Sequence, residues 1–177
     1  MAEYIVDTNV PLIAQDHAHM LPSCGEACSK FMQELFAGNY TLVLDEDDHI
    51  LSEYKGRMAQ STQNTFGKQF LIWIYTNQWD VNKVKKVTIS HTGAGNYNEV
   101  PQSLIDCEFD ISDRKFVAVA VANNFSAPIV QSADSKWIGW LPTLVVERVI
   151  VHFLCKVELQ AIHERKSGRK SKGKSKK

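Results

Sequence analysis

The fold class of this chain is first indicated by the residues Tyr4-Ile5-Val6-Asp7-Thr8-Asn9. Its three apolar residues have the pattern of a short buried strand, and the polar residues that follow mark the end of that strand. Residues 41–44 and 128–130 repeat the same strand pattern, and segments with helical spacing lie between the strands. Strands that alternate with helices predict an α/β fold, with a parallel sheet flanked by helices on both faces.

Helix start and stop signals divide the rest of the chain. Four segments have apolar residues at helical spacing: 26–37, 50–58, 65–78 and 113–122. The last of these also fits a strand, but its Ser-Asp start favours a helix. Residues 91–99 lack apolar periodicity and predict a loop, while residues 145–155 predict a last strand.

The composition of the 177 residues, with 44% hydrophobic and 23% charged residues, is that of a globular protein. The longest apolar run, residues 116–122, is much shorter than the roughly 20 residues that span a bilayer. No charged and then apolar leader opens the chain. The four cysteines do not make a disulfide scaffold at this length, so we expect them to be reduced. These features predict one cytoplasmic domain without a membrane partner.

The net charge of zero hides an asymmetry along the chain. Residues 1–164 contain 12 Lys and Arg against 20 Asp and Glu, whereas residues 165–177 contain eight basic residues and no acid. The Lys/Ser/Gly composition of residues 165–177 predicts a disordered, solvated basic tail after the domain. Two interpretations stay open: the tail is a solubilising end, or its charge brings a polyanion to the acidic body.

Four acidic residues are predicted to meet at one edge of the sheet. Asp7 and Asp134 follow two of the strands, Glu53 lies in the helix after the second strand, and Asp113 opens the helix before Asp134's strand. Binding sites in open parallel sheets lie beyond the carboxyl ends of the strands. Converging carboxylates repel one another, so the pattern predicts a hard cation such as Mg²⁺ or Mn²⁺ among them.

Two of these acids have a simpler explanation when each is considered alone. Asp113 could interact only with the dipole of the helix that it opens, and Glu53 could pair with Arg57 one turn further along its helix. Asp7 has fewer alternatives, because it follows an apolar strand directly.

The pattern resembles the PIN-domain nucleases, including the ribonuclease toxins of bacterial toxin–antitoxin pairs. The family's opening strand with Asp-x-Asn is matched by residues 5–10, and its Glu in a helix is matched by Glu53 in Ile50-Leu51-Ser52-Glu53. The third acid, at the start of a long apolar helix, is matched by residues 113–118, and the last by Asp134 in residues 132–137. The similarity in order and spacing extends from residue 4 to about residue 155.

This resemblance implies a metal-dependent endoribonuclease that hydrolyses phosphodiester bonds. The implied metal ligands are Asp7, Glu53, Asp113 and Asp134, and the implied polar contacts to phosphate or water are Thr8, Asn9 and Ser132. The cofactor would be Mg²⁺ or Mn²⁺. The substrate would be RNA, single-stranded rather than duplex, although the sequence does not distinguish RNA from DNA. A protein inhibitor (antitoxin) and a homodimer are the assemblies that the resemblance leaves open.

The chain departs from the family pattern at Lys136, where many relatives carry a further Asp. This lysine would weaken a second metal position, unless Asp110, one helical turn before Asp113, compensates for the lost acid.

Other interpretations compete with the nuclease. A phosphatase of the haloacid-dehalogenase type needs an acid where Asn9 stands. A zinc site would use His17 and His19 with Cys24 and Cys28, but this spacing matches no common zinc module. The serious alternative is a PIN-like module that binds nucleic acid or protein without catalysis. Four retained acids argue against this module, because their repulsion would bring it no benefit.

Overall fold

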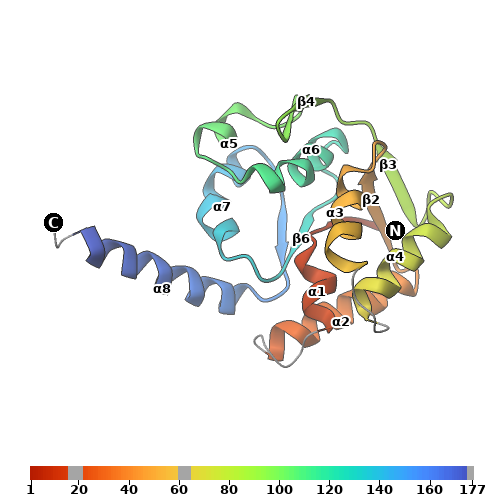
Figure 1. Cartoon of the computed structure of the whole chain (residues 1–177), viewed down its shortest axis with the longest axis horizontal. Helices are drawn as coiled ribbons and strands as arrows, with labels where there is room; N and C mark the ends of the chain where they lie inside the picture. The colour runs from red at the N-terminus through yellow and green to blue at the C-terminus, as the bar shows by residue number, and fades with distance from the viewer. Residues whose placement is uncertain (16–21, 60–64, 175–177) are drawn as a thin grey trace.

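The protein is described by a computed structural model that covers residues 1–15, 22–59 and 65–174. In this part of the chain, five parallel strands form one sheet (Figure 1). Their order across the sheet is β3 (Val84–Val87), β2 (Tyr40–Asp45), β1 (Ala2–Val6), β6 (Ile129–Gln131) and β7 (Val151–Phe153). The predicted α/β class and parallel sheet are confirmed.

Helices flank this sheet and connect its strands (Figure 1). They are α1 (Asn9–Gln15), α2 (Pro22–Phe36), α3 (His49–Met58), α4 (Phe66–Asn77), α5 (Gln102–Asp106), the 3-10 turn η1 (Ile111–Asp113), α6 (Arg114–Ala122), α7 (Lys136–Val146) and α8 (Lys156–Lys174). None of the described helices is long and apolar enough to cross a membrane.

Local sequence signals explain where these helices begin and end. The carboxylate of Asp45 accepts hydrogen bonds from the backbone N–H groups of His49 and Ile50, at 2.6 and 2.9 Å, and so caps the start of α3. α2 ends before Gly38, whose φ of 81° is a left-handed conformation that favours glycine. The Thr65 side chain accepts a hydrogen bond from the Lys68 N–H at the start of α4.

The ambiguous Val/Ala segment is a helix, as its start signal predicted. α6 contacts β1, β2 and β6 in the middle of the molecule. All residues from Phe116 to Ala120 are buried, which explains why the segment lacks the polar face of an ordinary surface helix. Ile5, Val6, Ile129 and Val130 are likewise fully buried, so the two central strands lie within the core.

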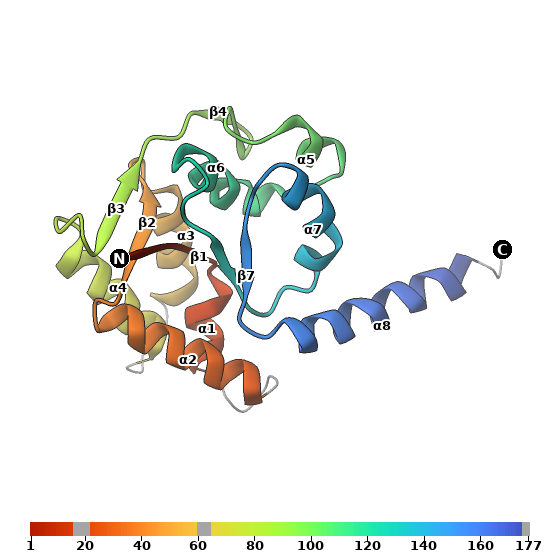
Figure 2. The same ribbon diagram turned by 180° about the vertical axis from the view of Figure 1, so that it is seen from behind.

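Two expectations about the connections and the C-terminus differ from the structure, and the last predicted strand is right only in part. The segment 91–99 contains a hairpin of β4 (His91–Gly93) and β5 (Asn96–Tyr97), where a loop was predicted. Within residues 145–155, only β7 is a strand, because α7 extends to Val146. Residues 165–174, predicted to be disordered, continue α8, which projects away from the rest of the protein (Figure 2). Residues 175–177 of the predicted tail lie outside the described residues.

The cysteines also differ from the prediction that they are reduced. A disulfide joins Cys24 at the start of α2 to Cys155 just before α8, 131 residues apart in the sequence. Cys28 and Cys107 are free thiols. Hydrophobic spacing carries no information about which cysteines meet, because that depends on how distant elements pack.

The strand order places a crevice at one edge of the sheet. The chain runs outward from β1 through β2 to β3, and then returns to the other side of β1 with β6 and β7. The direction of winding therefore changes between β1 and β6, which lie side by side through the pairs Ile5–Ile129 and Val6–Val130. In open α/β sheets such a switch point, at the carboxyl ends of the strands, is where ligands bind.

Candidate functional site

An open pocket of about 590 Å³ lies where β1 and β6 end. Five carboxylates line it: Asp7, Glu53, Asp110, Asp113 and Asp134. They come from the end of β1, from α3, from the segment around η1 and from the loop after β6. The structure thus brings the four predicted acids and Asp110 to a single pocket.

Asp7 is the most deeply buried of these acids, with 3% of its surface exposed. The backbone N–H of Asn9 donates to its Oδ1 at 2.8 Å, so the Asp-Thr-Asn turn itself holds the carboxylate in place. Burial raises the pKa of Asp7 to about 7, and the negative charges of Glu53 and Asp134 add to this effect. Because this pKa is close to neutral, a cation bound nearby would stabilise the ionised form of the carboxyl group at pH 7.

Asp113 has a similar environment at the start of α6. Burial, together with the negative charges of Asp7, Asp110, Asp134 and Glu53, raises its pKa to about 7. The Ser112 hydroxyl oxygen lies 3.5 Å from Asp113 Oδ1, which is long for a hydrogen bond. Two carboxyl groups with raised pKa values in one pocket mean that part of the pocket's negative charge lacks compensation from the protein.

Asp110 differs from Asp7 and Asp113, because it has a cationic partner. The Lys136 Nζ lies 3.0 Å from its Oδ2, and this contact lowers the pKa of Asp110 below its usual value. Its other oxygen, Oδ1, accepts from the N–H and the hydroxyl of Ser112, at 3.1 and 2.9 Å. Asp110 is therefore engaged within the protein as the cap of η1.

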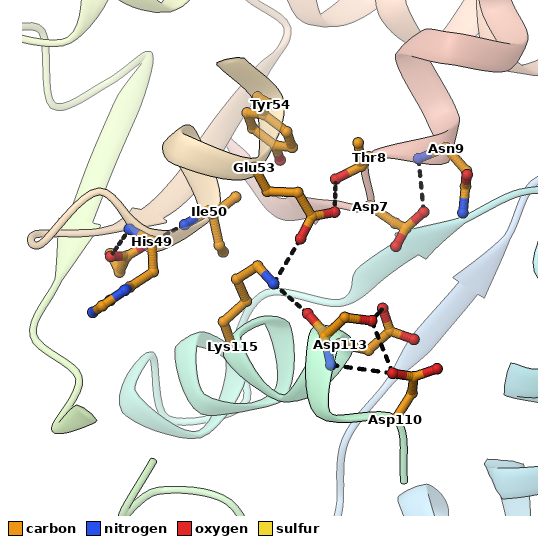
Figure 3. A network of polar contacts seen from close by, with 12 residues as sticks. Asp7, Thr8, Asn9, His49, Ile50, Glu53, Tyr54, Asp110, Asp113 and Lys115 are labelled. Atoms are coloured by element: carbon orange, nitrogen blue, oxygen red, sulfur yellow. Dashed lines mark hydrogen bonds and ion pairs between the residues drawn. The ribbon is translucent and has the colours of Figure 1, made fainter. Parts of the chain in front are cut away.

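Glu53 is also engaged through both of its oxygens (Figure 3). Thr8 donates its hydroxyl hydrogen to Oε1 at 2.5 Å, and the Lys115 Nζ lies 2.6 Å from Oε2. Lys115 also donates to the backbone carbonyl of Ser112. The structure does not show the alternative pairing of Glu53 with Arg57, although Arg57 lines the pocket.

Asp134 lies in the loop between β6 and α7. The backbone N–H of Lys136 donates to its Oδ1 at 2.9 Å, which fixes the carboxylate at the start of α7. Ala133 and Lys136 line the pocket beside it. The Ser132 hydroxyl, which the resemblance implied as a polar contact, is fully buried and lies outside the pocket lining. Asn9 and Thr8 do line the pocket.

The carboxylates share a pocket but are not gathered around one point. Within residues 1–15, 22–59 and 65–174, no group of three or more His, Cys, Asp or Glu side chains has a geometry that could hold a metal ion. The histidines of the zinc alternative, His17 and His19, lie outside the described residues. Cys24 of that alternative forms the disulfide with Cys155.

Sequence reasoning missed Lys115 as a member of this network. Its position two residues after Asp113 was visible, but a long side chain at a helix start can point in several directions. Only the packing of α6 against α3 places it on Glu53. The hydroxyl of Tyr54, which donates to the Val6 carbonyl, fixes α3 against β1 in the same region.

In comparisons with protein-family models, with curated proteins and with solved structures, the chain has no match.

Proposed function

We propose that this protein is a metal-dependent endoribonuclease with a PIN-like fold. The observation that carries the proposal is the pocket at the switch point between β1 and β6, into which four distant segments bring five carboxylates. The order of Asp7, Glu53, Asp113 and Asp134 along the chain supports it, because it matches the order of acids in the PIN-domain family. The five-stranded parallel sheet is consistent with such a fold.

The residues of the pocket fit Mg²⁺ or Mn²⁺ by their chemistry. All five acids offer hard oxygen ligands, which these two cations prefer. The raised pKa values of Asp7 and Asp113 identify negative charge that a divalent cation would stabilise. Side-chain rotation would have to bring the carboxylates together, because they do not yet have coordinating geometry.

Asp7, Asp113 and Asp134 would hold the cation. Among the described residues, none of these three forms an ion pair with lysine or arginine, whereas Glu53 and Asp110 do. A bound divalent cation would polarise the scissile phosphate and lower the pKa of a water molecule. The chain itself would supply Asn9 at the pocket wall to orient a phosphate oxygen, and Lys136 to attract the phosphate backbone.

The second candidate is a PIN-like module that binds nucleic acid or protein without cleaving it. The ion pairs Lys115–Glu53 and Lys136–Asp110 favour this candidate, because they compensate two of the five carboxylates without a metal ion. They leave three carboxylates without a lysine partner, which is why we place it second.

Cleavage of labelled single-stranded RNA and DNA, with Mn²⁺, with Mg²⁺ and with EDTA, tests the proposal. We expect cleavage of RNA that needs the metal and that disappears in Asp7→Asn. The Asp7→Asn chain should keep its fold, because the asparagine oxygen can still accept from the Asn9 N–H. If folded Asp7→Asn protein cleaved at the rate of the wild type, the assignment of the site would be wrong. Metal-independent binding without cleavage would support the second candidate.

A further inference from the structure

Glu53 differs from Asp7 and Asp113 in the partners of its carboxylate oxygens. Lys115 is 12% exposed and contacts Glu53 Oε2 at 2.6 Å, whereas Glu53 Oε1 is occupied by the Thr8 hydroxyl. Both carboxylate oxygens therefore already have a donor. A carboxylate whose charge is compensated by a lysine has less to gain from a metal ion than Asp7 or Asp113.

We propose that Glu53 is a positioning residue and not a metal ligand, and that Lys115 is its counter-ion. This inference rests on the proposed nuclease function and specifies the residues that hold the cation. Lys115 does not line the pocket, so it acts through Glu53 and not by contact with the substrate. The pair would keep Glu53 away from the cation, which would leave Asp7, Asp113 and Asp134 as its ligands.

The same network determines what the Thr8 hydroxyl can do. A threonine hydroxyl has one hydrogen, and Thr8 donates it to Glu53. Thr8 is 3% exposed and lines the pocket, so the lone pairs of its oxygen are left to accept a hydrogen bond there. Thr8 would therefore accept from a water molecule and hold it beside the phosphate, rather than donate to a phosphate oxygen.

Two other clusters of polar and aromatic side chains lie outside this network. The first is formed by the rings of His49, His91 and Tyr97, whose centroids lie 4.9 to 5.5 Å from one another. Its two histidines would offer a metal only two nitrogen ligands. The buried Arg114 lines a shallow depression next to Asp110, but its guanidinium already donates to the Phe109 carbonyl and to Asn96. Neither group has a feature that identifies a ligand.

A charge-conserving pair of substitutions tests the role of Glu53 directly. Glu53→Gln together with Lys115→Met removes one negative and one positive charge, so the net charge around the pocket stays the same. The affinity for Mn²⁺, measured by calorimetry or electron paramagnetic resonance, should change by less than about threefold. Asp113→Asn removes a proposed ligand and should weaken binding by about tenfold or more.

A single substitution that removes the Lys115 charge should raise the affinity for Mn²⁺, whereas Asp113→Asn should lower it. Lys115→Met frees Glu53 to approach the cation, so Mn²⁺ should bind about tenfold more tightly. Lys115→Arg keeps the positive charge and should restore the affinity of the wild type. Lys86→Met is the matched control, because it breaks the Lys86–Asp48 pair at 2.8 Å, whose residues lie outside the pocket lining. It should leave the Mn²⁺ affinity unchanged.

A kinetic measurement separates positioning from a merely structural role. With Lys115→Met present, Glu53→Gln keeps an acceptor for the Thr8 hydroxyl, whereas Glu53→Leu does not. We expect the Leu variant to lose about ten- to hundredfold more in kcat, with KM for RNA unchanged, because the held water loses its orientation. Equal kcat values for the two variants would contradict the role of Thr8.

The outcomes also separate this inference from the proposed function. If the Glu53→Gln/Lys115→Met protein bound Mn²⁺ as weakly as Asp113→Asn, Glu53 would be a ligand, and the inference would fail while the nuclease proposal stood. If the wild-type protein neither bound Mn²⁺ nor cleaved RNA, both would fail.

Discussion

Asp7 combines a position required for the proposed chemistry with a cost to the folded state. The residue follows the fully buried Ile5 and Val6 at the end of β1, and its carboxyl group has a pKa of about 7, against an ordinary value of 3.8. The fold therefore disfavours the charged form of a group that is charged in the unfolded chain at neutral pH. Such a residue stabilises the protein only when a cation or a proton is present.

The pH dependence of stability should reveal this cost. Below about pH 4 Asp7 is protonated in both states, but between about pH 4 and 7 only the unfolded state loses the proton, so the free energy of unfolding falls as pH rises. Above about pH 7 the loss is complete and amounts to about 2–4 kcal/mol. Urea unfolding of the wild type and of Asp7→Asn, without divalent metal from pH 4 to 8, measures the difference. A constant difference would show that Asp7 ionises normally in the folded protein.

The mutual repulsion of the pocket's acids should also affect the thermal stability of the protein. Without metal, Asp113→Asn and Asp134→Asn should keep the Tm of the wild type or raise it, because each removes one of several like charges. Mg²⁺ should raise the Tm of the wild type by mass action, and it should raise the Tm of the variants less. Calorimetry with and without Mg²⁺ measures both effects. Equal Mg²⁺-induced shifts in all three proteins would mean that the two acids are not ligands.

At the scale of elements, α8 connects the basic end of the chain to the rim of the pocket. Its first half is fixed to the body by the Ser23–Glu158 hydrogen bond at 2.6 Å and by the His163 ring, whose Nδ1 lies 3.1 Å from the Ser135 carbonyl. His163 lies over Gly139, where a Cβ atom would be only 3.1 Å from its ring. Ser135 is the neighbour of Asp134, so the basic residues begin close to the carboxylates.

Removal of residues 167–177 should weaken RNA binding without a change in cleavage at saturating RNA. This truncation keeps the Lys166–Ser135 contact at 3.2 Å and removes six positive charges. If half of these charges contact phosphates, log K against log salt should become less steep by about 2, because each phosphate in a single strand contributes about 0.7. Binding assays at several salt concentrations, in the Asp7→Asn background, measure the slope.

A full-length variant with glutamine at the basic positions of residues 167–177 is the matched control. It should behave like the truncated chain, because charge and not length is responsible. An unchanged slope in both variants would show that this part of α8 takes no part in RNA binding.

In the molecule as a whole, the disulfide between Cys24 and Cys155 joins α2, in the first part of the chain, to the residue just before α8. Cross-linking residues this far apart limits the freedom of the unfolded state, and its removal typically costs about 2–4 kcal/mol. Cys24→Ser should therefore lower the free energy of unfolding in urea by this amount, while a reductant should destabilise only the wild type. The denatured, non-reduced protein should have two titratable thiols, Cys28 and Cys107. Four thiols would show that the bond does not form, and Cys107→Ser should lower the count by one.

The α/β class, the approximate positions of α2, α3, α4 and α6, and the edge of the sheet to which the acids come were predictable from the sequence. These features depend on local information: apolar periodicity identifies strands and helices, and the carboxyl end of a strand identifies the edge of the sheet. Asp7, Asp113 and Asp134 were predictable for this reason, because Asp7 directly follows β1, Asp113 directly precedes α6, and Asp134 lies in the short loop after β6.

The pairing of these residues depends on how distant elements pack together. Glu53 had Arg57 one turn away as an obvious partner, yet it pairs with Lys115, which is 62 positions distant and comes from a helix packed against α3. Cys24 pairs with Cys155 and not with the nearby Cys28. Long side chains and thiols meet according to how distant elements pack, and apolar periodicity describes one element at a time. The sequence therefore predicted which acids reach the pocket, and the packing of the helices determined which of them lack a lysine partner.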